Sequence, residues 1–134
     1  LAPMEVLWAA TTAGRSWRAA VIEAEERAKA GTPAWVYQLG AGGAFKAPHA
    51  ADIALVFDNA PAATQALSGR MSAAFAAFAK AGDPNCREIP RWERYELARR
   101  RTMVFDVGDV RMADDPRGAE RRFFARVPYV QPGT

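Results

Sequence analysis

The segment AWVYQL, residues Ala34–Leu39, is the clearest guide to the fold in this sequence. Its large side chains, Trp35, Tyr37 and Leu39, point to one face of a strand, and smaller apolar side chains alternate with them. A strand that is apolar on both faces is typical of the centre of a sheet covered by helices on both sides. A glycine-rich loop follows from Gly40, where α/β proteins often place their chemistry. The sequence therefore predicts an α/β fold.

Helical periodicity flanks this strand on both sides. Thr11–Ala30 carries an apolar stripe and is predicted to end at Gly31. Leu67–Ala81 is predicted to begin with Ser68 as N-cap and to end at Gly82. The apolar face of the second helix is expected to comprise Leu67, Met71, Ala74, Phe75 and Phe78.

The last third of the sequence predicts a hairpin and a short helix. Thr102–Val107 has the pattern of a strand, and Val110–Met112 is placed to pair back onto it. Asp114-Asp115-Pro116 is typical of a helix start with proline at the first helical position, and we expect this helix to reach about Arg122 and to bury Phe123 and Phe124. A strand with two apolar faces needs neighbouring strands and helices to cover it, and these elements supply few of them. We therefore expect 1–134 to be a single carboxyl-terminal segment of a longer chain.

Composition restricts the classes of partner. The 134 residues carry a net charge of +3, and the one dense basic cluster is Arg99–Arg101. No aromatic interleaving or second basic run supports a nucleic-acid contact, so a solvated connector before a strand is favoured and no nucleic-acid partner is expected. Apolar runs are too short for a bilayer, so no membrane partner is expected either. The lone Cys86 fits an ordinary loop thiol and, with no leader visible, favours a soluble cytoplasmic protein.

His49 is the only histidine and the main candidate for chemistry. With Asp52 it could supply two metal ligands from one helical turn, but a zinc site needs three or four, so no metal is expected. Phe45 and Ala47 stand where phosphate-binding motifs need glycine or a hydroxyl, so no nucleotide cofactor is expected. From the residues alone, His49 is either a general base or a packed side chain.

Three blocks resemble a known family in their order along the chain. They are GAFKAPHAADIALVFDN from Gly43, LSGRMSAAFAAFAKAGDPN from Leu67, and IPRWERYELARRRTMVFDVGDVRMADDP from Ile89. Together they resemble the carboxyl-terminal part of type-B carboxylesterases, which include bacterial para-nitrobenzyl esterases and the cholinesterases. The resemblance covers about Trp35 to Pro116. The Pro90-Arg91-Trp92 segment departs from the Trp-Pro element that is usual in the family.

The resemblance implies the carboxyl-terminal portion of an α/β-hydrolase fold, incomplete on its own, and hydrolysis of small carboxylic esters through an acyl-enzyme. His49 matches the family's catalytic histidine, and Asp52 matches a supporting acidic position three residues later. The resemblance implies no cofactor. The nucleophile motif Gly-x-Ser-x-Gly is absent, because the serines are Ser16, Ser68 and Ser72. The resemblance thus implies that an amino-terminal remainder, in an enzyme roughly four times longer, supplies the serine, acid and oxyanion hole, and that this segment alone is inactive.

Alternatives remain open at this stage. Related proteins with lost triads serve in adhesion, so the chain could be a non-catalytic interaction module whose histidine only packs. A second alternative makes Asp52 the triad acid, with a serine from a partner chain. The two-faced strand also predicts self-association of the isolated segment through strand pairing. A Gly-x-Ser-x-Gly motif encoded before Leu1 would discriminate the enzyme from the interaction module.

Overall fold

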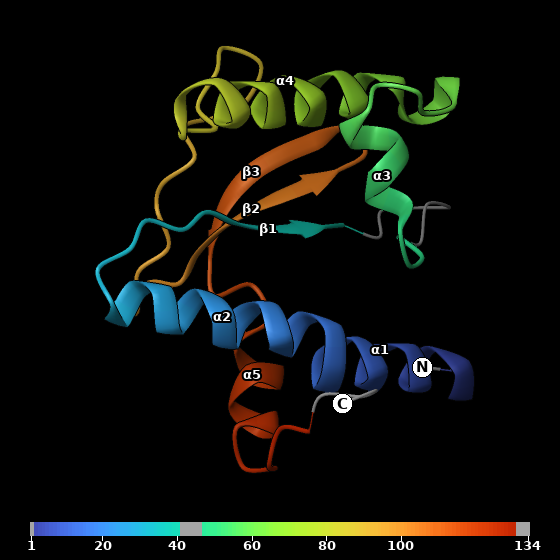
Figure 1. The fold of residues 1–134 in the computed structure, drawn as a ribbon. Coiled ribbons are helices and arrows are strands. Elements are labelled where there is room, and N and C mark those ends of the chain that lie inside the picture. The colour runs from blue at the N-terminus through green and yellow to red at the C-terminus, as the bar shows by residue number, and fades with distance from the viewer. Residues whose placement is uncertain (1, 41–46, 131–134) are drawn as a thin grey trace.

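The computed structural model describes residues 2–40 and 47–130 of the chain. Its architecture is α/β, as predicted, and Figure 1 shows a small sheet with α4 over one face and α2 along the other. In chain order the elements are α1 (Pro3–Thr11), the π-helical turn η1 (Thr12–Ser16), α2 (Trp17–Lys29), β1 (Val36–Leu39), α3 (Ala51–Val56), the 3₁₀ turn η2 (Ala62–Thr64), α4 (Gln65–Ala81), β2 (Arg101–Asp106), β3 (Asp109–Asp114) and α5 (Gly118–Phe124).

The sheet has the order β1-β2-β3, with β1 parallel to β2 and β3 antiparallel to β2. The predicted hairpin is confirmed, and Gly108 makes its turn with a φ of 82°. The predicted central position of Ala34–Leu39 is wrong for the described residues. β2 is the central strand, and β1 lies at the sheet edge with one hydrogen-bonded neighbour. Ala34 precedes β1, and its carbonyl accepts from the Tyr95 amide instead.

Both faces of β1 nevertheless contact apolar clusters, as the two-faced pattern predicts, with Val36 buried and the other three residues half-buried. The larger apolar cluster lies between the sheet and α4, and the smaller one lies on the α2 side. In the parallel register Tyr37 lies beside Met103, so the two side chains share the α4 face. Val36 packs on the other face with Ala24 of α2. The buried members of the larger cluster are Leu55, Leu67, Met71, Ala74, Ile89, Trp92, Met103, Phe105 and Val110.

The first helical region begins earlier than predicted. The chain is helical from Pro3, and the predicted segment Thr11–Ala30 contains the π-helical turn η1 before α2. Gly14 of this turn lies against α5, where an added Cβ would come 3.0 Å from the Phe124 ring. The predicted end is confirmed, because Gly31 has a φ of 70° immediately after the helix.

Helix α4 starts two residues earlier than predicted, and its N-cap is Thr64, not Ser68. Ser68 lies inside the helix, fully buried, and its hydroxyl donates to the Leu55 carbonyl at 3.0 Å. A side chain that the local sequence favours as a cap is therefore used for a tertiary contact. Phe78, expected on the buried face, is 48% exposed and packs edge-on against Trp35.

Helix α5 begins at Gly118, so Pro116 precedes the helix rather than occupying its first position. Asp115 has a φ of 45°, and its carboxylate accepts from Arg121 at 2.8 Å. This left-handed residue turns the chain before the helix can start. Phe123 was expected to be buried and is 65% exposed, whereas Phe124 is half-buried.

Candidate active site

His49 lies on a tight turn between β1 and α3, and its side chain is exposed. The Pro48 carbonyl accepts from the Ala51 amide at 3.0 Å, which closes the turn around His49. Ala50 follows in the left-handed region, with a φ of 64°. The loop residues 41–46, which include most of the glycine-rich run and Phe45, lie outside the described residues. The turn thus presents His49 on the surface of the described chain.

Helix α3, which sequence patterns did not predict, carries Asp52 in its first turn. His49 precedes the helix, so the two side chains do not share one helical turn, contrary to the geometry considered for a metal pair. Among the described residues no group of three His, Cys, Asp or Glu side chains is arranged to hold a metal ion.

The carboxylate of Asp52 is held by Tyr37 of β1. The Tyr37 hydroxyl donates to Oδ2 of Asp52 at 2.8 Å. Burial, together with this hydrogen bond, raises the pKa of Tyr37 well above its usual range. The phenol therefore remains a protonated donor at neutral pH. Sequence reasoning missed this role, although Tyr37 supplies the only hydroxyl within the apolar segment AWVYQL.

Three aromatic rings enclose the Tyr37 ring. Phe75 of α4, Trp92 of the following loop and Phe105 of β2 meet it edge to face, with centroids 5.8, 6.4 and 6.1 Å away. Edge-to-face pairs prefer this separation and restrict ring orientation. Trp92 lies within the segment that departs from the family's Trp-Pro pattern, yet it is buried and its indole donates to the Val36 carbonyl at 3.2 Å. Trp92 is therefore part of the core beside β1.

The carboxyl end of α3 is fixed to α4. Leu55 is fully buried, and its carbonyl accepts the Ser68 hydroxyl described above. Ser68 is thus an internal tether. Within the described part of the chain no hydrogen bond or ion pair joins Asp52 to His49, while the Tyr37 bond occupies one carboxylate oxygen. Among the described residues, the side-chain partner of Asp52 is therefore Tyr37.

Cys86 lies in the loop after α4 and is half-buried. Burial raises the pKa of its thiol, which lowers the population of the reactive thiolate. This environment agrees with the ordinary loop thiol that the sequence suggested.

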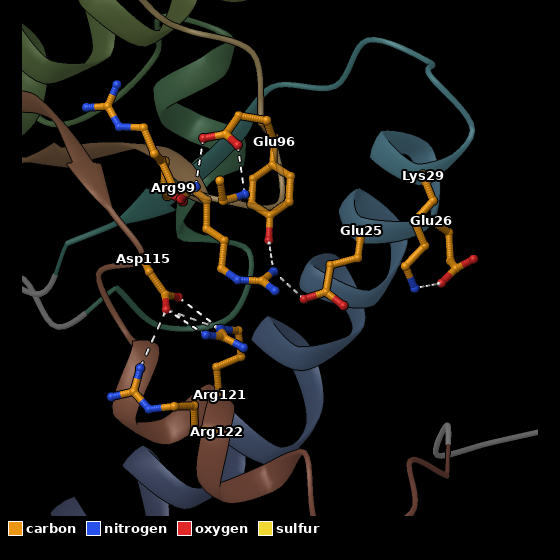
Figure 2. Close-up of polar contacts among 12 residues, drawn as sticks. Glu25, Glu26, Lys29, Glu96, Arg99, Asp115, Arg121 and Arg122 are labelled. Atoms are coloured by element: carbon orange, nitrogen blue, oxygen red, sulfur yellow. Dashed lines mark hydrogen bonds and ion pairs between the residues drawn. The ribbon is translucent and has the colours of Figure 1, made fainter.

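The basic cluster Arg99–Arg101 belongs to an ionic network and is not a solvated connector. Arg100 pairs with Glu25 of α2 and donates to the Tyr95 hydroxyl, while Arg101 pairs with Glu93 at 2.8 Å. The side chains of Arg100 and Arg101 are only 19% and 16% exposed. Figure 2 shows Glu25 of α2 facing the loop before β2, and Asp115 facing Arg121 and Arg122 of α5. Arg99 and Arg101 share the partners Glu93 and Asp114, while Asp115 pairs separately with Arg121 and Arg122. We call these neighbouring groups of ion pairs, together with the Arg100–Glu25 pair, the arginine network.

A pocket of about 440 Å³ lies beside β1, between α2 and α4. Trp35 and Phe78 contribute large apolar surfaces to it, and neither His49 nor Asp52 lines it. Two polar side-chain atoms in and just before β1 are buried and have no hydrogen-bond partner within the described residues. They are Nε1 of Trp35 and Oε1 of Gln38. The pocket is therefore a feature of the sheet edge, separate from the histidine turn.

Comparisons with known proteins agree with this arrangement. The profile of the carboxylesterase family matches residues 12–124. No curated protein sequence matches the chain. In the part of the chain that the structure describes, no helix combines the length and apolar character needed to span a bilayer.

Solved esterase structures share the fold. PNB esterase superposes with a TM-score of 0.74 at 26% identity, over 86% of this chain and 26% of that chain. A thermophilic PNB esterase gives 0.76 at 24% identity, over 90% and 27%. The Geobacillus stearothermophilus carboxylesterase EST55 gives 0.62 at 28% identity, over 74% and 23%. The chain spans about a quarter of the length of these structures. Since the family profile covers most of its residues, the chain belongs to the carboxylesterase family.

Proposed function

We propose that the complete protein is a serine carboxylesterase and that this chain is its carboxyl-terminal segment, contributing the general base His49. The observation that carries the proposal is the place of His49 in a chain of this family. It lies on a tight turn that follows a parallel strand, with its side chain accessible to groups from elsewhere. Loops after the carboxyl ends of such strands are where α/β proteins gather their chemistry.

In the proposed reaction, His49 moves one proton in each half-cycle. As a serine oxygen from the amino-terminal remainder attacks the ester carbonyl carbon, the imidazole accepts the hydroxyl proton. When the tetrahedral intermediate collapses, the ester C–O bond breaks and the leaving alkoxide takes that proton. Water then attacks the acyl-enzyme by the same route and releases the carboxylic acid. Asp52, held by Tyr37, supports the turn that carries the base.

The amino-terminal remainder is also the proposed partner at the β1 edge. β1 has one hydrogen-bonded neighbour among the described strands, and the pocket beside it is lined by apolar side chains such as Trp35 and Phe78. Buried polar atoms without partners are rare in complete domains, so Trp35 Nε1 and Gln38 Oε1 are expected to gain partners from that remainder. Without the remainder there is no elbow serine, and the segment alone is expected to hydrolyse esters no faster than free imidazole.

The experiment replaces His49 by Ala in the complete enzyme. We expect kcat for para-nitrophenyl acetate to fall at least about a thousandfold, because removal of a triad member abolishes most of the acceleration. Labelling of the serine by an organophosphonate should slow in parallel, while the urea midpoint of unfolding should stay unchanged, since His49 is exposed.

Arg87→Ala is the control for this test. The Arg87 side chain is 93% exposed in the loop after α4, so this variant should keep the parental rate. Turnover near the parental value in a folded His49→Ala enzyme would refute the catalytic assignment. Absence of Gly-x-Ser-x-Gly from the sequence encoded before Leu1 would refute the serine esterase itself.

A further inference from the structure

We propose that Tyr37 is a positioning residue for this reaction: its hydroxyl holds Asp52 and, through the first turn of α3, fixes the backbone that carries His49. This inference rests on the proposed function, because it assigns no chemistry of its own to Tyr37. Its basis is three groups of contacts that together connect the core to the histidine turn.

The first contact is the hydrogen bond between Tyr37 and Asp52. It joins the central part of β1 to a helix 15 residues later, with 2.8 Å between Oη and Oδ2. Both side chains are half-buried, so the carboxylate has lost part of its hydration and needs the donor. A hydrogen bond to an ionised acceptor is shorter and stronger than one between neutral groups.

The second set of contacts keeps Tyr37 itself in place. The three edge-to-face rings of Phe75, Trp92 and Phe105 leave the phenol little rotational freedom. Trp92 also donates its indole N–H to the Val36 carbonyl, which ties the same strand to the loop. The hydroxyl is therefore presented from a rigid part of the core.

The third set transmits the constraint to His49. Two backbone hydrogen bonds, Ala51 N to Pro48 O at 3.0 Å and Ile53 N to Ala50 O at 3.2 Å, span the residues between His49 and Asp52. Asp52 is only three residues beyond His49, so these overlapping turns restrict the backbone conformation between the two residues. At its other end α3 is tethered by Ser68. A helix of six residues held at both ends gives the turn before it a defined position.

The test is Tyr37→Phe in the complete enzyme, because this substitution keeps the ring and removes only the hydroxyl. We expect kcat for para-nitrophenyl acetate to fall about tenfold, the effect of losing roughly one hydrogen bond's worth of transition-state stabilisation. KM should change less than about twofold, since a positioning defect reduces transition-state rather than ground-state interactions. Circular dichroism and the urea midpoint verify that the variant is folded.

Tyr95→Phe is the matched control. It removes the hydroxyl of another buried tyrosine, whose partner is Arg100 in the arginine network. Because this hydroxyl belongs to that network and not to the Asp52 pair, kcat should stay within about twofold of the parent. An equal loss of kcat in Tyr95→Phe and Tyr37→Phe would overturn the proposal, since it would indicate a general loss of packing.

A double-mutant cycle with Asp52→Ala tests whether Tyr37 acts through Asp52. We expect the double variant to be no slower than the slower single variant, because both substitutions break the same contact. Losses that multiply, or a folded Tyr37→Phe enzyme with parental kcat, would overturn the proposal. If Tyr37→Phe does not fold, parental kcat in a folded Asp52→Ala enzyme would overturn it equally. These outcomes are distinct from failure of the proposed function, which requires His49→Ala to retain turnover.

Discussion

At the residue scale, Gly40 ends β1 at a position where no side chain fits. Its amide donates to the Phe105 carbonyl at 2.6 Å, and an added Cβ would come 2.6 Å from Cγ of Asp106. We expect Gly40→Ala to destabilise the full-length protein by about 1–3 kcal/mol, the usual cost of overpacking. Urea unfolding of the full-length protein measures this change.

The control for Gly40 is another glycine that lacks this constraint. Gly69 lies in α4, and an added Cβ there meets nothing within 4 Å. Gly69→Ala should therefore stabilise the protein by up to about 1 kcal/mol through helix propensity. If the two substitutions moved the urea midpoint in the same direction, the close approach at Gly40 would not be the determining factor.

Ala50 adopts a backbone conformation that favours glycine, directly after His49. Its φ of 64° costs an alanine of order 1 kcal/mol, which the surrounding turn has to offset. We expect Ala50→Gly to leave stability within about 1 kcal/mol, because relief of strain is opposed by the larger entropy of the unfolded chain. It should also lower kcat of the complete enzyme, because a freer turn positions His49 less well. A lower KM together with a higher kcat would contradict this expectation.

At the element scale, an ion pair holds the start of α5: Arg121 of the helix donates to Asp115 in the turn before it. The hydrogen bond from Arg121 keeps the pKa of Asp115 below its usual range, and the charges of Arg121, Arg100 and Arg122 add to the effect. A carboxylate with a lowered folded-state pKa stabilises the protein above its unfolded pKa of about 3.9, and this stabilisation is lost as the pH falls through the folded value. The stabilisation that this ion pair gives to the start of α5 should therefore be lost in acid.

Asp115→Asn tests this dependence. At pH 7 the variant should be less stable than the parent by about 1 kcal/mol. The difference should shrink below about pH 4, where the carboxyl of the unfolded parent binds a proton first, and vanish once the folded carboxyl is protonated at lower pH. Thermal unfolding midpoints measured between pH 3 and pH 7 report the change. The control is Asp109→Asn, whose partner Arg111 is exposed, so that the pair contributes little. A difference between parent and Asp115→Asn that stayed constant across this pH range would contradict the assignment.

At the scale of the whole molecule, the edge of β1 is the feature that most affects behaviour in solution. An unpaired strand edge is a template for another strand. We expect the isolated 134-residue chain to self-associate, with a sedimentation coefficient that rises with concentration. Amides of β1 should exchange faster than those of β2, which has neighbours on both sides. A monomer at all concentrations with strong amide protection over Trp35–Leu39 would contradict this prediction.

Features that depend only on neighbouring residues could be predicted from the sequence. The ends of two helices at Gly31 and Gly82 were predictable because both need a left-handed residue that glycine supplies most easily. The two apolar faces of Ala34–Leu39 followed from strand periodicity. The ordered family blocks identified His49 as the candidate base. These inferences need only a short window of sequence or the order of such windows.

Tertiary structure alone decided what depends on contacts between distant residues. The Tyr37–Asp52 bond spans 15 positions and the Arg100–Glu25 pair spans 75, so no local pattern marks them. Serine is a common helix cap, but the Ser68 hydroxyl instead donates to the Leu55 carbonyl and so joins α4 to α3. The edge position of β1 likewise depends on which strands are present to pair with it. Local propensities are weak, about 1 kcal/mol per residue or less, and burial or pairing with a distant partner outweighs them.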